Sequence, residues 1–213
     1  MQKKIKIFLI IIILCAATGG SFYWQWSKKP SEEPRETPQP PTLFGKEDYK
    51  IEERADGKYI VVEKVGLTCK VPEEWKIEQT KGYSYPEPGY WIDLYSPDAE
   101  VFDVLTKGCG ISIMTGIAKE TVEEIKENIK LIQQHPEKSN EIREDYNYEI
   151  IGINNYQGLK WISPEKPIFG QASGVDIPIG DKKLINLSTQ FPPGYKEKCF
   201  PIWEEFLKTV VIK

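Results

Sequence analysis

A group of aromatic side chains in the first half of the chain is the strongest candidate for molecular recognition. Proline and glycine residues are interleaved with its members, Tyr83, Tyr85, Tyr90, Trp91 and Tyr95. Tyrosine and tryptophan combine a large apolar ring with one hydrogen-bonding group, so they suit both packing and binding. Two interpretations stay open: a hairpin whose rings pack on a sheet, or an exposed loop that grips a partner, sugar or peptide.

The residue types that catalysis requires are scarce. A serine or cysteine nucleophile needs a base, and the only imidazole, His135, precedes Pro136 at the end of a predicted helix. There it most simply interacts with the exposed carbonyl groups of the last helical turn. The run from Phe169 to Gly174 lacks the lysine of a phosphate-binding loop. The sequence therefore predicts no catalytic residues and no cofactor.

Carboxylates raise two further possibilities. Four of them lie close together in the chain: Asp93, Asp98, Glu100 and Asp103. Their spacing does not match a calcium-binding EF-hand loop, so we predict a solvated turn and no metal site. The alternative to a binding module is a hydrolase or other enzyme that uses Glu73, Glu74 or Asp93 beside the aromatic group. Two carboxylates converging in an apolar pocket would favour that enzyme.

Three of the four cysteines follow the N-terminal apolar segment, and their positions predict one disulfide. Cys109 and Cys199 each lie at the end of a predicted element, where the backbone can adjust to a bridge. Cys69 alternates with Leu67 and Val71, which is typical of a buried thiol on one face of a strand. We expect a bridge between Cys109 and Cys199. Three reduced cysteines packed as apolar residues remain the alternative.

The charge is distributed unevenly along the chain. Residues 1–44 carry six basic and three acidic side chains, whereas residues 45–213 carry 22 basic and 29 acidic ones, a net charge of −7. An acidic domain lacks the basic surface on which nucleic-acid binding depends. The sequence therefore excludes a nucleic-acid partner for residues 45–213.

The N-terminus has the composition of a membrane anchor. Residues 1–6 are a short basic tail, and the stretch from Ile7 to Ser27 contains no charge. As a helix this stretch would span ~32 Å, against a hydrocarbon core of ~30 Å. We predict a cytoplasmic tail over 1–6, a single transmembrane anchor over 7–26, and an extracytoplasmic domain. A cleaved signal peptide is the rival interpretation, because the most apolar run is short.

Five prolines among polar residues fill the segment that follows, residues 27–44. Such a composition cannot bury a core and favours extended conformations, so we predict a linker or stalk. Residues 45–213 then form the folded domain. Its short β-branched or alternating runs, over 59–62, 66–71, 75–79, 90–95, 110–116, 148–153, 157–162 and 183–190, predict a mostly antiparallel sheet.

Two helices are expected within this domain. Thr121 and Glu124 form a capping box, and an apolar stripe follows as far as His135. A second helix begins near Lys198 and tolerates Pro201 only in its first turn. The segment between residues 163 and 180 is rich in glycine and proline and is expected to be a connection. The predicted fold class is α+β, an antiparallel sheet flanked by helices and preceded by one transmembrane helix.

The run from Gly66 to Trp75, GLTCKVPEEW, resembles the early strand and Pro-x-x-Trp motif of PsbP-like domains. The segment from Ile151 to Gly158 and the ending from Cys199 to Ile212 are similar to the same family plan. The resemblance covers about residues 58–213. It implies an antiparallel sheet between helices and assigns no catalytic or metal-binding residue, since one fold can serve unrelated functions.

Taken together, these features predict a membrane-tethered extracytoplasmic binding or assembly module without catalytic activity. Its expected partners are the membrane, through one single-pass anchor, and a protein or other component of the cell envelope.

The anchor can be tested on native membranes. Because an uncharged segment of membrane length follows a basic tail, we expect the chain to stay in the pellet during alkaline carbonate extraction. N-terminal sequencing of the recovered protein is the control. A soluble product whose N-terminus lies near Gly20 would show that the segment is a cleaved signal peptide.

Overall fold

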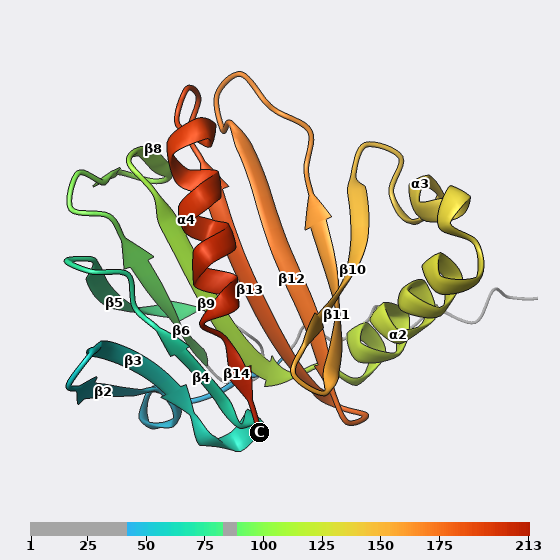
Figure 1. The fold of residues 1–213 in the computed structure, drawn as a ribbon, viewed down its shortest axis with the longest axis horizontal. Helices are drawn as coiled ribbons and strands as arrows, with labels where there is room; N and C mark the ends of the chain where they lie inside the picture. Colours follow the sequence, from blue (N-terminus) through green and yellow to red (C-terminus); the bar gives the residue numbers. More distant parts are fainter. Residues whose placement is uncertain (1–41, 83–88) are drawn as a thin grey trace, which may run out of the picture. The chain divides into compact units, whose positions relative to one another are not determined.

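Figure 1 shows the computed structural model, which describes residues 42–82 and 89–213. Its largest feature is an antiparallel sheet of eight strands. Seven strands follow one another in the spatial order β10 (Asn147–Ile153), β11 (Tyr156–Ile162), β12 (Gln171–Ile179), β13 (Lys183–Phe191), β9 (Gly110–Ile117), β6 (Gly89–Tyr95) and β5 (Lys76–Gly82). The eighth, β1 (Thr42–Leu43), pairs with the last residues of β9. We call this eight-stranded sheet the main sheet.

Two smaller sheets complete the strands. One has the order β14 (Val211–Ile212), β4 (Leu67–Lys70), β3 (Gly57–Val62) and β2 (Lys50–Arg54). The other is the hairpin of β7 (Glu100–Val101) and β8 (Leu105–Lys107). Short 3-10 turns lie at η1 (Lys46–Asp48), η2 (Glu63–Val65) and η3 (Pro136–Lys138). The helices are α2 (Lys119–Gln134), α3 (Ser139–Ile142) and α4 (Lys196–Lys208).

The main hydrophobic core lies between one face of the main sheet, helix α4 and the four-stranded sheet. On β13 the buried residues Ile185, Leu187 and Phe191 alternate with polar ones, so every second side chain points into this core. Helix α4 adds Trp203 and Phe206, which are almost completely buried and stack at 5.8 Å between ring centroids. Figure 1 shows α4 running alongside β13.

Helix α2 packs on the opposite face of the main sheet. Its apolar stripe, which includes Ile125 and Ile129, forms a second small core with Leu159 and Leu184. Leu184 adjoins Ile185 on β13, and neighbouring residues of a strand point to opposite faces. Helix α2 therefore covers one part of the second face, and the rest of that face carries both polar and aromatic side chains, such as Ser112, Ser188 and Trp91.

The predicted α+β fold class is wrong. The protein is mostly antiparallel β-sheet with few helices, and the largest error concerns residues 163–180, where a connection was expected. Residues Gln171–Ile179 form β12, a nine-residue strand between β11 and β13. Gly174 and Pro178 prevent the prediction of this strand from the sequence, because both residues normally weaken or exclude a central strand. Pro178 lies beyond the last pair with β11, Leu159↔Asp176, so no residue of β11 is registered with it.

Three further expectations concern the helices. Helix α2 begins at Lys119 after the N-cap Ala118, so the predicted capping box of Thr121 and Glu124 is wrong. Helix α4 begins at Lys196, so Pro201 lies inside the helix and not in its first turn. Among residues 42–82 and 89–213, no helix is long and apolar enough to cross a membrane. The predicted transmembrane anchor over residues 7–26 lies outside the described residues. At the other end of the predicted linker, Thr42 and Leu43 form β1 and Phe44 is buried.

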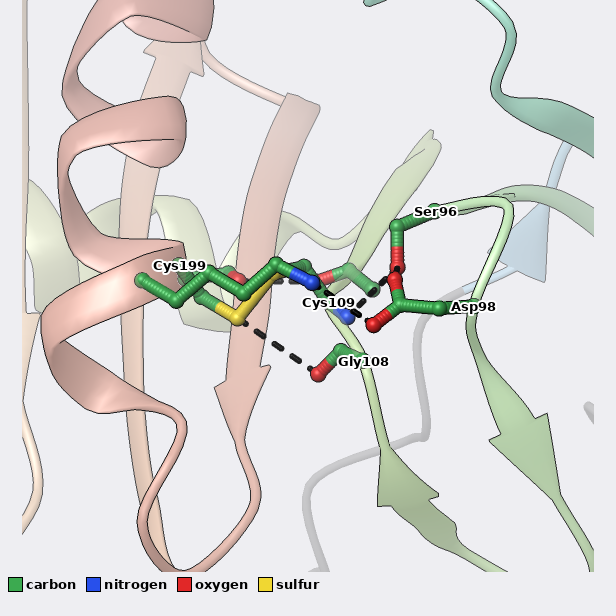
Figure 2. Close-up of a disulfide and its surroundings, with 8 residues drawn as sticks. Ser96, Asp98, Gly108, Cys109 and Cys199 are labelled. Carbon is green, nitrogen blue, oxygen red and sulfur yellow. Dashed lines mark hydrogen bonds and ion pairs between the residues drawn. A yellow bond between two sulfur atoms is a disulfide. The ribbon is translucent and has the colours of Figure 1, made fainter.

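The structure contains the disulfide between Cys109 and Cys199 (Figure 2), with the two Cα atoms 5.4 Å apart. It joins the start of β9 to the first half of α4. The neighbouring residue Lys198 forms an ion pair with Asp98 at 2.6 Å, and Ser96 Oγ accepts a hydrogen bond from the Cys109 amide at 2.9 Å. Cys69 is a free, buried thiol, and its burial raises its pKa to about 12.

Reduction of this disulfide is expected to destabilise the domain. The bridge joins residues that are 90 positions apart in the chain, and a loop of that size corresponds to about 4.6 kcal/mol in the chain-entropy model. Chemical unfolding with and without dithiothreitol measures the loss. The variant Cys69→Ala is the control, because it should show the same sensitivity to reductant as the parent. Equal stability with and without reductant would contradict the bridge.

Candidate functional site

A polar row crosses the second face of the main sheet where helix α2 does not cover it. The strand register places Trp161, Gly174, Ser188, Ser112 and Asp93 opposite one another on five consecutive strands. These positions alternate with core residues such as Ile113 and Leu187 along the same strands. Because the sheet is antiparallel and in register, five residues from distant parts of the chain line up as one surface.

A groove of about 570 Å³ lies over this row. The β7–β8 hairpin contributes Val101 and Asp103 to its lining, and the connection between β11 and β12 contributes Lys166 and Phe169. Aromatic side chains are prominent in the lining, namely Trp91, Tyr95, Tyr146, Trp161 and Phe169. An apolar groove with a few converging polar groups is the usual form of a binding site.

Asp93 is the most deeply placed charged group in the groove lining, with 6% of its surface exposed. Its carboxylate accepts hydrogen bonds from Thr80 Oγ1 at 2.6 Å, from Trp91 Nε1 at 2.7 Å and from the Ser112 hydroxyl. Among the ion pairs of residues 42–82 and 89–213, none involves Asp93. Three hydrogen-bond donors, and not a cation, therefore compensate the energetic cost of burying this carboxylate.

Trp161 ends the polar row on β11, and Trp91 lies two residues from Asp93, which ends the row on β6; the two indoles are held in the same way. Trp91 Nε1 donates to Asp93, and Trp161 Nε1 donates to Asp176 Oδ2 at 2.9 Å. Each indole also lies directly against a glycine: a Cβ on Gly82 would collide with Trp91, and a Cβ on Gly174 would collide with Trp161. Each ring is therefore fixed close to the sheet by a hydrogen bond to a carboxylate and by a glycine that leaves room for it.

Asp176 is the second carboxylate that accepts a hydrogen bond from an indole. It accepts a hydrogen bond from Asn186 Nδ2 at 2.6 Å in addition to that from Trp161. Burial raises the pKa of Asp176, and the bonds from Asn186 and Trp161 oppose this rise. The residues next to it, Tyr146 and Tyr148, stack with ring centroids 6.1 Å apart, and Tyr146 also contacts Trp161 at 5.9 Å.

The structure separates the members of the aromatic group that the sequence predicts. Trp91 and Tyr95 line the groove, whereas Tyr90, on the alternate face of β6, packs against the main core. Burial, followed by the negative charges of Asp93 and Glu78, raises the pKa of Tyr95 to about 12. Tyr83 and Tyr85 lie outside the described residues.

Sequence reasoning missed the half of the groove that comes from later strands. Trp161, Ser188 and Gln190 line it together with Tyr146 and Ser112. The polar alternation of Asn186, Ser188 and Gln190 along β13 was the one available signal, because a polar residue at every second position indicates an exposed face. Which strands lie beside β13 could not be read from that pattern.

The carboxylates suggested for an enzyme do not form one site. Glu73 and Glu74 are exposed and line a separate cavity beside Trp75, whereas Asp93 lies in the groove. Asp98 pairs with Lys198, and Glu100 pairs with Lys107 at 2.7 Å. Within the described part of the chain, no group of three or more histidine, cysteine, aspartate or glutamate residues could hold a metal ion.

His135 lies at the end of α2, where it is half-exposed. Its Nδ1 is 3.3 Å from a carboxylate oxygen of Glu137, and its backbone amide donates to the Leu131 carbonyl at 2.8 Å. His135 is not among the residues that line the groove. The backbone of His135 therefore ends the helix, whereas its imidazole lies beside Glu137; the predicted contact of the imidazole with the helix carbonyls is wrong.

The fold and the groove define a mostly antiparallel β protein with an aromatic-lined groove on one face of its main sheet. Comparison with known families finds no matching family model, and no curated protein matches the chain. Among solved structures, a crystal structure of a protein from Bacteroides thetaiotaomicron VPI-5482 is similar with a TM-score of 0.40 and 14% identity. The match covers 70% of this chain and 45% of that protein, so the chain spans less than half of its length.

A similarity at that TM-score supports no conclusion about fold or function. None of these comparisons bears on the resemblance to PsbP-like domains, which stays a prediction.

Gly174→Ala tests whether the glycine positions Trp161. The new methyl group must displace the indole or the strand, so we expect a loss of about 1–3 kcal/mol in unfolding free energy. Near-ultraviolet circular dichroism should show the altered surroundings of the tryptophan. Gly152→Ala in β10 is the matched control, since nothing lies within 4 Å of its added Cβ. Equal stability of the two variants would contradict the proposed packing.

Proposed function

We propose that residues 42–213 form a binding module without catalytic activity that acts outside the cytoplasm and takes its ligand in the groove. The observation that carries this proposal is the polar row, with Trp161 at one end and with Trp91 two residues from Asp93 at the other. A sheet face exposed only by chance would not require a buried carboxylate, three hydrogen-bond donors and two closely fitted glycines to hold two indole rings in place. Such preorganisation lowers the entropic cost of binding.

The disulfide supports the extracytoplasmic location. Disulfides persist in oxidising compartments and are rare in the cytosol, where thiols are kept reduced. The bridge here joins buried cysteines of the main core and belongs to the scaffold. The uncharged N-terminal segment from Ile7 to Ser27 supports attachment to a membrane, with residues 27–41 as the connection.

The arrangement of Asp93 supports binding over catalysis. A general acid or base needs a free oxygen directed at the ligand, yet Asp93 accepts bonds from Thr80, Trp91 and Ser112. The remaining carboxylate in the lining, Asp103, is exposed on the β7–β8 turn. Asp93 therefore serves mainly to hold the groove in shape.

The test is a binding screen with the full chain in a polyoxyethylene detergent, which carries no sugar headgroup. The panel contains neutral oligosaccharides, peptides and mixed micelles of phospholipid with the same detergent, and isothermal calorimetry measures each interaction. We expect at least one class to bind and the variants Trp91→Ala and Trp161→Ala to weaken that binding by about tenfold or more.

Phe102→Ala is the matched control for this screen. Phe102 is an aromatic residue of the β7–β8 hairpin and is 81% exposed, but it does not line the groove. Its replacement should leave binding unchanged. Absence of binding by every class, or binding that both tryptophan variants retain in full, would overturn the proposed function.

A further inference from the structure

We propose that the groove binds a neutral carbohydrate chain, which lies across β6 to β11 and stacks a sugar ring on Trp91 and another on Trp161. This inference rests on the proposed binding function and names its ligand class. Four features of the groove support it: the orientation of the two indoles, their separation, the polar groups between them and the charge of the lining.

The orientation of the indoles suits sugar rings. Each ring has its N–H directed at a carboxylate of the sheet, and its six-membered part lies against a glycine, Gly82 or Gly174. Both tryptophans are half-buried, so part of each ring remains exposed to the groove that they line. The face of an aromatic ring carries partial negative charge, and the C–H groups on one face of a sugar ring carry partial positive charge. Flat, exposed indoles therefore offer stacking platforms.

The separation of the indoles requires an extended ligand. Strands β9, β13 and β12 lie between β6 and β11, so four interstrand spacings of ~4.8 Å separate the backbones of Trp91 and Trp161 by ~19 Å across the sheet, and the register adds an offset of two residues along the strands. An aromatic cage for a small cation needs several rings around one point, which this separation does not allow. One ligand that contacts both rings must be a chain.

The groups between the indoles suit hydroxyl groups. Ser112 and Ser188 are directly paired across β9 and β13, and Gln190 follows on the same face. Among the hydrogen bonds of the described residues, none involves the Ser188 hydroxyl, which is only half-buried and can both donate and accept. Sugar hydroxyls also donate and accept, so they match such a floor better than a purely apolar segment does.

The charge of the lining favours a neutral ligand. Among residues 42–82 and 89–213, its charged members are Asp93, Asp103 and Lys166, and none of its members is an arginine. An anionic polymer would meet a net negative groove without a bidentate partner for phosphate or carboxylate. The domain as a whole carries a net charge of −7 over residues 45–213, which also disfavours polyanions.

A peptide fits the groove less well. Extended peptides commonly pair with the free edge of a sheet. The floor of this groove consists of interior strands, β6, β9, β13 and β12, each of which has a paired strand on both sides. Their backbone groups are already used in the sheet, so a peptide in the groove would leave its own backbone without such partners.

The experiment measures affinity against chain length. The full chain in a polyoxyethylene detergent is titrated by calorimetry with cello-oligosaccharides and chito-oligosaccharides from the mono- to the hexasaccharide. We expect affinity to rise with length until one chain reaches both indoles. Trp91→Ala and Trp161→Ala should each lower the affinity of the longest oligomers by about tenfold and leave that of the shortest oligomers much less changed.

Further variants separate a loss of binding from a loss of folding and test the floor of the groove. Trp91→Phe and Trp161→Phe keep an aromatic face and should retain most of the affinity, and circular dichroism should match that of the parent. Ser188→Ala removes one hydroxyl from the floor without disturbing a hydrogen bond of the described residues, and should weaken binding severalfold. Phe102→Ala should have no effect.

The outcomes distinguish this inference from the proposed function. If peptides or phospholipid–detergent mixed micelles bind in a tryptophan-dependent manner and no oligosaccharide does, the carbohydrate inference is overturned and the binding function stands. If no ligand of any class binds, both fail. If oligosaccharides bind equally well at every length, or equally well to the alanine variants, the two-platform geometry is wrong.

Discussion

The antiparallel pairing of β9 with β13 is the constraint on which both the core and the groove depend. In this register Ile113 faces Leu187 on the core side, and Ser112 faces Ser188 on the groove side. A slip of one residue would exchange the two faces, placing serines in the core and isoleucines in the groove. Burial of the apolar face therefore fixes the polar row at the same time, and the groove needs no separate source of stability.

The elements around this pair hold it from the core side. Helix α4 covers β13, and its Cys199 is bonded to Cys109 at the start of β9. Lys160 of β11 is buried and forms an ion pair with Glu204 of α4 at 2.7 Å. Breaking a buried pair leaves an uncompensated charge, so this contact fixes where α4 lies on the sheet. A covalent bond and an ion pair thus attach one helix to two different strands of the main sheet.

The groove side uses a different physical device. Asp93 and Asp176 each combine burial with hydrogen bonds from an indole and from one or two other side chains. Charge-assisted hydrogen bonds of this kind are stronger and more directional than neutral ones. The carboxylates therefore restrict the tryptophan rings, and Gly82 and Gly174 make room for them. We regard this restriction as the property that would give the groove selectivity for a ligand with flat faces.

The sequence by itself determined the local features of this protein. Alternation identified most strands, and the apolar stripe after Thr121 identified helix α2, because strand and helix periods are properties of short segments. The positions of Cys109, Cys199 and Cys69 were enough to predict one bridge and one buried thiol, both of which the structure contains. Trp91 and Tyr95 could be selected as binding candidates because aromatic residues gathered among turn residues are unusual.

Only the tertiary structure decided the fold class and the groove. Glycine and proline concealed β12, which could be assigned only when β11 and β13 were present on either side. The partnership of Trp91 with Trp161 links residues 70 positions apart in the sequence through three intervening strands. No local pattern encodes such a partnership, because the order of strands in a sheet results from the burial of one common apolar face, to which the whole chain contributes.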